Sequence, residues 1–309
     1  MFQQYPHLNG VFLVVIASFF WGTTGTVASL VPDISSLAIG AGTMGLGGVL
    51  LVWDGRASLK QDQQKLRSLM PLIFVGGVAV SLYSLAFYTS MTFSGVAIGT
   101  LVSIASAPFF TVLMERLISK KRISARWLFS FVSGALGTLL LAQGKQPPLA
   151  LVEHHNTMAM VGIGLGLVAG FCYAVYSWVA RQMIEKGVCS KSAMASQFGL
   201  AALCLLPSLA FTGSNMLSDT KHVVAVLYIA CIPMFLGYLC FGYALQKIEA
   251  SKATLITLLE PAIATMFAIY VVGERFSYVG WYGIVLIVIC FALQVFQPAP
   301  NSLPSKPNI

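Results

Sequence analysis

Long apolar stretches alternate with short polar segments along the whole chain. Each stretch has roughly 18 to 24 predominantly apolar residues, the length that an α-helix needs to cross a bilayer. The pattern therefore predicts transmembrane helices over residues 10–31, 34–53, 70–91, 95–117, 126–143, 158–180, 192–212, 223–246, 252–272 and 278–296. The first stretch lacks a basic segment before it, so we expect an uncleaved helix rather than a signal peptide. Very short links between neighbouring stretches predict antiparallel hairpins.

Composition places the chain among integral membrane proteins. Charged residues make up 9% of the sequence and hydrophobic residues 57%, whereas an ordinary soluble domain has about a quarter charged residues. A soluble fold of this length would need a polar surface that this sequence lacks. Lipid-facing side chains, by contrast, are apolar all round. The expected fold class is all-α integral membrane, with ten transmembrane helices.

The net charge of +8 reports topology and does not predict a nucleic-acid partner. With both termini in the cytoplasm, most Lys and Arg residues fall in cytoplasmic loops, and only Lys145, Lys221 and Arg275 fall outside. This positive-inside bias predicts a multi-pass protein of the bacterial inner membrane.

Cysteine and histidine usage predicts neither a cofactor nor a metal site. The six cysteines lie mostly in apolar stretches without a CxxC pair, and the four histidines fall in predicted loops or in the N-terminal tail. That pattern argues against a disulfide framework, a zinc site and an intramembrane haem or diiron centre.

The two halves of the chain resemble each other. Residues 17–28 align with residues 169–180, and Pro108 corresponds to Pro261 at almost the same offset. We predict a first five-helix repeat over 1–150, a second over 151–297 and a cytoplasmic tail over 298–309. An odd helix number per repeat inverts the second one, which is the architecture of many secondary transporters. Shared composition of two apolar helices remains the alternative explanation.

Several motifs carry a family resemblance. They are Phe20-Trp21-Gly22, the run from Tyr243 to Leu255, Leu259-Glu260-Pro261 and Gly273-Glu274-Arg275. With these the chain resembles the drug/metabolite transporter superfamily, specifically the bacterial ten-helix EamA-type exporters. The resemblance implies export of amino acids, amines or related metabolites. It also implies a central cavity walled by helices 1–4 and 6–9, with helices 5 and 10 peripheral.

The sequence departs from the pattern of that family in three places. Thr43 stands where this branch often has an arginine. Lys120-Lys121 is the first-half counterpart of Gly273-Glu274, and Ala107 is the counterpart of Glu260.

Glu260 is the sharpest candidate site residue. It falls near the midplane of the ninth predicted helix, directly before a proline. A carboxylate at that depth costs several kcal/mol unless it faces a cavity, is paired or is protonated. We expect it to hold a substrate amine or to carry the coupling proton. The alternative is a structural carboxyl that bonds backbone groups freed by Pro261 or pairs with Lys252.

The matched prolines and a set of aromatic residues are further candidates. Pro108 and Pro261 remove backbone hydrogen bonds at corresponding points of the two halves, which predicts hinges or site-forming bends; static kinks are the alternative. Tyrosine and tryptophan offer an apolar face with a polar group, which suits an amphiphilic substrate. The candidate substrate-binding residues are Trp21, Thr24, Tyr83, Tyr88, Tyr173, Tyr176, Tyr243 and Glu260. Ordinary helix packing competes with this role for each aromatic ring.

These features together favour a secondary transporter that exports a small metabolite by alternating access. No Lys or Arg falls at the midplane of a predicted helix, which disfavours phosphorylated substrates. The alternative is a multispan membrane enzyme, of acyl- or prenyltransferase type, for which His154-His155-Asn156 is the only catalytic cluster. The expected partners are a small-molecule substrate and membrane lipid, with a homodimer allowed.

Overall fold

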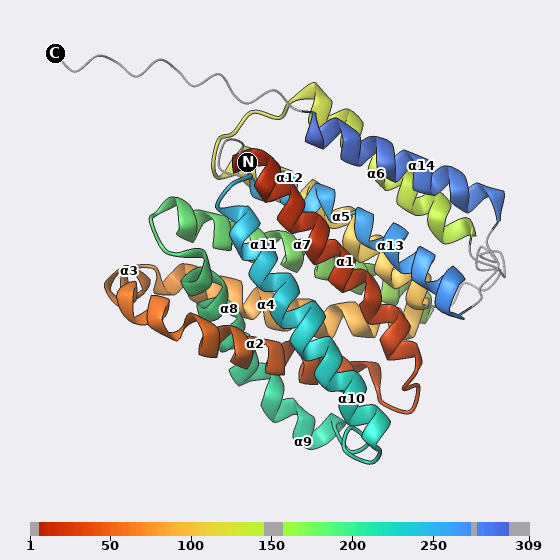
Figure 1. Ribbon diagram of the computed structural model, residues 1–309, viewed down its shortest axis with the longest axis horizontal. Helices are drawn as coiled ribbons and strands as arrows, with labels where there is room; N and C mark the ends of the chain where they lie inside the picture. The colour runs from red at the N-terminus through yellow and green to blue at the C-terminus, as the bar shows by residue number, and fades with distance from the viewer. Residues whose placement is uncertain (1–5, 145–156, 273–276, 297–309) are drawn as a thin grey trace.

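The computed structural model describes residues 6–144, 157–272 and 277–296, and every regular element in these ranges is helical. Ten of the helical segments are long and apolar enough to cross a membrane, which confirms the predicted all-α membrane architecture (Figure 1). The first six are α1 (Pro6–Ser29), α2 (Ser36–Gln61), α4 (Met70–Ser94), α5 (Val96–Leu117), α6 (Ala125–Gly144) and α7 (Thr157–Glu185).

The remaining spans are less regular. The seventh joins α8 (Ser190–Leu205) through a short 3₁₀ turn (Leu206–Ser208) to α9 (Leu209–Thr212). The eighth joins α10 (Thr220–Ile229) through a π-helical segment (Ala230–Gly237) to α11 (Tyr238–Leu245). The ninth consists of α12 (Ala250–Ile256), α13 (Leu259–Phe267) and a π-helical end (Ala268–Val272), and the tenth is α14 (Tyr278–Val295).

The second span extends beyond its predicted end. We predicted an end at residue 53 because charged residues follow, but the helix continues to Gln61, and a short helix, α3 (Gln63–Ser68), comes after it. Outside the bilayer a helix no longer needs apolar side chains, and Lys and Arg are good helix formers. Asp54 lies in this extension and pairs with Lys191 of α8 at 2.9 Å.

We call the end of the bundle at which α1 starts the proximal end and the opposite end the distal end. The predicted topology makes the proximal end cytoplasmic. Hydrogen bonds at each end join segments that an alternating direction of the spans would bring together. Lys65 bonds the carbonyl of Gly187 at the proximal end, and Asn215 bonds that of Asp33 at the distal end.

The packing partners follow a pattern. The first span packs against the eighth and ninth, and the sixth packs against the third and fourth. The second packs against the seventh, and the fifth against the tenth. The same pairs result when each span of the first half is exchanged with the corresponding span of the second half, the first with the sixth and so on to the fifth with the tenth. That is the pattern expected of two halves related by a two-fold axis.

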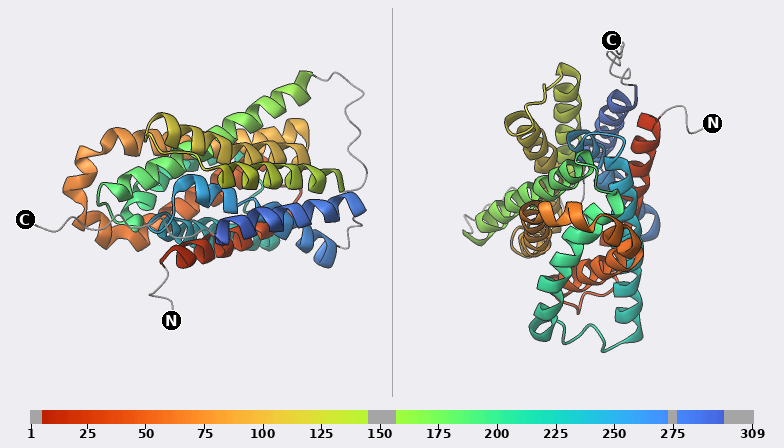
Figure 2. Two further views of the ribbon diagram at one scale, coloured as in Figure 1. Left: turned by 90° about the horizontal axis from the view of Figure 1, so that it is seen from above. Right: turned by 90° about the vertical axis from the view of Figure 1, so that its left-hand side faces the viewer.

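Helices α6 and α14 form a pair at one edge of the bundle, seen side by side in Figures 1 and 2. Their backbones approach closely at Gly137 and Gly283. A Cβ atom added at Gly137 would lie 2.8 Å from the Gly283 carbonyl oxygen. The hydroxyl of Ser133 donates to the carbonyl of Leu286 at 2.9 Å. Small residues at such a crossing are the usual device for close packing of transmembrane helices.

Candidate functional site

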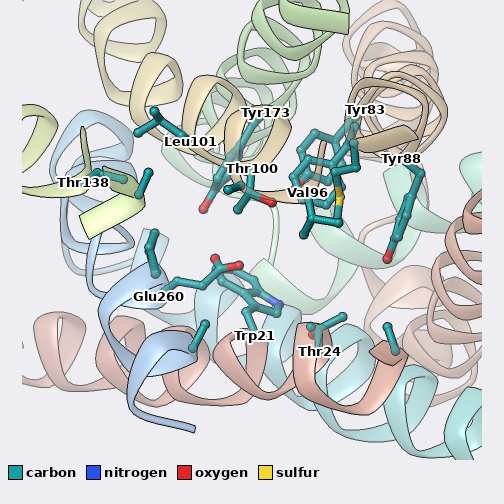
Figure 3. Close-up of a pocket in the computed structure, with 18 of the residues that line it drawn as sticks. Trp21, Thr24, Tyr83, Tyr88, Val96, Thr100, Leu101, Thr138, Tyr173 and Glu260 are labelled. Atoms are coloured by element: carbon teal, nitrogen blue, oxygen red, sulfur yellow. The ribbon is translucent and has the colours of Figure 1, made fainter. Parts of the chain in front are cut away.

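A cavity of about 180 Å³ lies between the middle of the bundle and its distal end (Figure 3). It is lined by side chains from the distal halves of α1, α2, α4, α5 and α6, and by residues near the middle of α7, the eighth span and the ninth span. Aromatic rings, threonine hydroxyls and one carboxyl group make up its chemistry. The lining residues that bear these groups are Trp21, Thr24, Tyr83, Phe87, Tyr88, Thr100, Thr138, Tyr173, Tyr176, Tyr238, Glu260 and Thr265.

Glu260 owes its position to a break in the ninth span. Helix α12 ends at Ile256, and α13 starts at Leu259, so Glu260 lies in the first turn of a new helix. Pro261 follows, where its missing N–H removes no intrahelical bond. The Glu260 N–H donates to the carbonyl of Thr257 at 2.9 Å. The carboxylate is thereby held at a helix N-terminus, where the helix dipole favours negative charge.

The break is tied to the cavity wall on the opposite side. The phenol of Tyr173 donates to the Thr257 hydroxyl at 3.1 Å, and that hydroxyl donates to the carbonyl of Thr254 at 2.7 Å. In Figure 3 the Glu260 carboxylate lies beside Trp21, with Tyr173 facing both. Glu260 is half-buried, so its carboxyl group meets the cavity without being sealed from it.

Aromatic contacts hold the rest of the wall. The Trp21 ring lies 4.9 Å from that of Tyr238, and its indole N–H donates to the carbonyl of Pro233 at 2.9 Å. This carbonyl lies inside the π-helical segment of the eighth span, where the regular hydrogen-bond pattern is interrupted. The phenols of Tyr176 and Tyr238 share a hydrogen bond of 3.2 Å, and Tyr173 stacks on Tyr176 at 5.1 Å.

The structure gathers most of the predicted site residues in this one cavity. Those that line it are Trp21, Thr24, Tyr83, Tyr88, Tyr173, Tyr176, Glu260 and Pro261. Tyr243 lies elsewhere, in a surface groove between α1 and α11 beside Phe12 and Lys247. Pro108 is buried in α5, which continues as one helix through it, so the two prolines occupy different local structures.

Sequence reasoning missed the contribution of the fifth span. The resemblance implied that this helix is peripheral, yet Thr138, Leu141 and Ala142 of α6 line the cavity. No charge or motif marks these residues, and the Thr138 hydroxyl bonds the carbonyl of Gly134, as threonines commonly do in helices. Thr100 and Leu101, near the start of α5, also line the cavity. Their side chains face it because of how α5 packs against α7, which the sequence does not reveal.

Two charged residues of the proximal end have structural roles. Glu115 is buried and accepts the N–H of Ser251 at 3.3 Å, which caps the start of α12. Lys252, considered as a partner of Glu260, contacts the imidazole of His7 on α1.

A cluster of ion pairs crosses the proximal end. Lys121 lies 3.1 Å from Glu185 and 3.4 Å from Glu249, and Arg181 lies 2.8 Å from Glu185. Burial lowers the pKa of Lys121, but Glu249, Glu115 and Glu185 outweigh it and leave the pKa raised. The lysine is therefore charged at neutral pH. We call Lys121, Glu185, Glu249 and Arg181 the proximal ion cluster.

Some predicted features lie outside the described residues, namely His154-His155-Asn156, Gly273-Glu274-Arg275 and the tail over 298–309. All six cysteines lie within the described part and are free thiols. In that same part, no three His, Cys, Asp or Glu side chains come together as metal ligands would.

Comparison with known proteins identifies the family. The model of the EamA-like transporter family matches the chain twice, over residues 8–143 and 160–296. An uncharacterized transporter of Bacillus subtilis (strain 168), YwfM, is 30% identical over 292 residues, covering 93% of each chain. A probable amino-acid metabolite efflux pump of Escherichia coli (strain K12) is 25% identical over 71% of this chain and 75% of its own. A protein of known crystal structure has the same fold, with a TM-score of 0.76 at 17% identity over 92% of this chain and 95% of that one.

Proposed function

Because this chain belongs to the EamA-like transporter family and is a multi-pass membrane transporter, we propose that it exports a small metabolite, such as an amino acid or amine, across the bacterial inner membrane. Relatives named as probable amino-acid metabolite efflux pumps support export as the direction and set the range of substrates. Both termini lie in the cytoplasm in this proposal, as the distribution of Lys and Arg predicts.

The observation that carries the proposal is the position of Glu260. It is the one ionisable carboxyl group among the described residues that line the cavity, and it lies at a break in a transmembrane helix. Broken helices at the middle of the membrane are where secondary transporters form their binding sites. Glu260 binds the substrate amine in one step and a proton in the other, so that export uses the proton gradient.

Alternating access follows from two halves that rock about this site. The proposed halves are residues 1–150 and 151–297, and the pairing of spans one to five with spans six to ten supports a two-fold relation between them. In the conformation described here, the cavity lies toward the distal end, and the proximal ion cluster closes the other end. A homodimer is compatible with this mechanism but is not required by it.

Proteoliposomes test the proposal directly. Purified protein should give saturable uptake and counterflow of a radiolabelled amino acid or amine, which neither a channel nor a membrane enzyme gives. Glu260→Gln retains size and hydrogen bonding but does not titrate, so we expect this variant to insert normally and to lose the pH dependence of transport between about pH 5.5 and pH 8. Glu260→Asp is the matched control and should retain it. Wild-type rates for Glu260→Gln throughout that range would make the carboxyl structural.

A further inference from the structure

The charges of the cavity discriminate between the two substrate classes that the proposed function allows. An amino acid at neutral pH carries an ammonium and a carboxylate, whereas an amine carries only the ammonium. The described residues that line the cavity include Glu260 and no Lys, Arg or His. Among the described residues, the site therefore offers a partner for the ammonium but no cationic partner for a carboxylate, and an unpaired carboxylate is costly to bury.

Neutral donors could replace a cation, but here many are already engaged. The indole N–H of Trp21 bonds Pro233, and the phenol of Tyr173 bonds Thr257. One of the phenols of Tyr176 and Tyr238 donates to the other. A carboxylate placed against these groups would have to break those bonds to obtain a donor from them.

The N-terminus of α13 is the other place where a transporter could bind a substrate carboxylate, because a broken helix exposes free N–H groups there. In this protein that position is occupied. The Glu260 N–H bonds Thr257, Pro261 has no N–H, and Glu260 itself puts a carboxylate in the first turn. A second carboxylate at this helix end would meet repulsion instead of free donors.

The remainder of the cavity fits an apolar body. Tyr83 stacks on Phe87 at 5.4 Å, and Tyr83 lies 5.8 Å from Tyr173, so aromatic faces surround the space beside Glu260. Aromatic faces attract cations as well as apolar groups. A cavity of about 150 Å³ accepts benzene, so 180 Å³ is enough for a substrate with one ring. The Thr24 hydroxyl, which lines the cavity, is buried without a hydrogen-bond partner among the described residues, as expected of a group that a ligand satisfies.

We propose that the cavity selects amines with one positive charge and an apolar body, and that it rejects the corresponding zwitterionic amino acids. This inference rests on the proposed function, since it names the substrate class of the same cavity. Glu260 binds the ammonium, and the aromatic wall holds the body.

Matched ligands test the inference. Phenethylamine, phenylalanine and phenethyl alcohol share one body and differ in charge. With the wild-type protein in proteoliposomes, we expect phenethylamine to drive counterflow and to bind at least tenfold more tightly than either of the others. Tyramine against tyrosine and isoamylamine against leucine repeat the comparison for other bodies.

The results of these experiments distinguish a wrong substrate class from a wrong assignment as a metabolite exporter. If no amine binds at least tenfold more tightly than its amino acid, the substrate class is wrong, while counterflow of the amino acids would leave the transporter proposal intact. If neither member of any pair gives counterflow, the metabolite-export proposal fails as well.

A pair of variants locates the selectivity. Glu260→Gln should bring phenethylamine and phenethyl alcohol to within a fewfold of each other. Asp33→Asn removes an exposed carboxyl outside the cavity and should keep the wild-type ratio. Glu260→Asp, which retains the charge, should keep a preference for the amine even if its affinity falls. An unchanged ratio in a folded Glu260→Gln variant would overturn the assignment.

Discussion

The proximal ion cluster should set how often the transporter opens toward its proximal end. Lys121 comes from the loop between α5 and α6 in the first half of the chain, and its partners Glu185 and Glu249 belong to the second half. If the halves rock apart at this end, both contacts must break. Lys121→Met removes the charge and retains the length and the apolar part of the side chain. We therefore expect this variant to favour the proximally open state.

The expected magnitude follows from the exposure of the pairs. The side chains of Lys121 and Glu185 are 27% and 33% exposed, and that of Glu249 is 55% exposed. Exposed pairs contribute about 0.2–1 kcal/mol each, so two pairs on one lysine contribute about 0.4–2 kcal/mol. A difference of that size corresponds to roughly a 2- to 30-fold increase in the population of the open state. Because the pKa of Lys121 is raised, the contribution is fully present below the ordinary lysine pKa and is lost only as the pH rises through the raised value.

Thiol labelling measures this population. Thr254 of α12 is completely buried in the described conformation, between the cavity and the proximal end. In a cysteine-free background, Thr254→Cys should react slowly with a membrane-impermeant thiol reagent added from the proximal side. Adding Lys121→Met should accelerate the reaction about 2- to 30-fold. Lys60→Met, at an exposed lysine of the same end, is the control and should leave the rate unchanged. Equal rates for Lys121→Met and the control would refute the closing role of the cluster.

Three further expectations concern other parts of the fold. Burial would raise the pKa of Asp62, but bonds from the Cys189 N–H, Ser192 and Lys65 outweigh it and leave the pKa lowered. The ionised carboxylate therefore stabilises the folded protein above about pH 4, and this stabilisation is lost below it. Asp62→Asn should lower the melting temperature at pH 7 but not at low pH. Gly137→Ala should destabilise the α6–α14 contact by about 1–3 kcal/mol, whereas the Gly164→Ala control, with open space around it, should not lower the melting temperature. Pro261→Ala should slow counterflow more than Pro108→Ala, because only the first lies at a helix break. Wild-type rates in both variants would assign both prolines to static packing.

The spans were predictable because hydropathy acts locally. Each apolar stretch must become a helix in lipid, whatever its neighbours are. The end of α2 was not predictable from hydropathy, because the charges of Asp54 and Arg56 mark the membrane surface and not the end of the helix. Hydropathy reports where the bilayer stops, and the helix extends past that point.

The site was only partly predictable because side-chain direction depends on helix phase. Tyr238 and Tyr243 are both tyrosines of the eighth span, but only Tyr238 lines the cavity. Five residues turn a helix by about 500°, so the two point roughly 140° apart. Which one faces inward depends on the π-helical segment before them, and no sequence pattern predicted that segment. Thr138 was missed for a related reason, since its exposure to the cavity depends on how the α6–α14 pair is positioned.

The bond from Trp21 to Pro233 has a consequence for motion. A π-helical turn can migrate or revert to an α-helix only if its hydrogen-bond pattern is redrawn. Here one of its carbonyls is held by a side chain from the first span. Gly237 packs against the same indole, so that an added Cβ would lie 2.7 Å from the ring nitrogen. The pitch of the eighth span and the position of the first span are therefore coupled, so that a change in one is transmitted to the other.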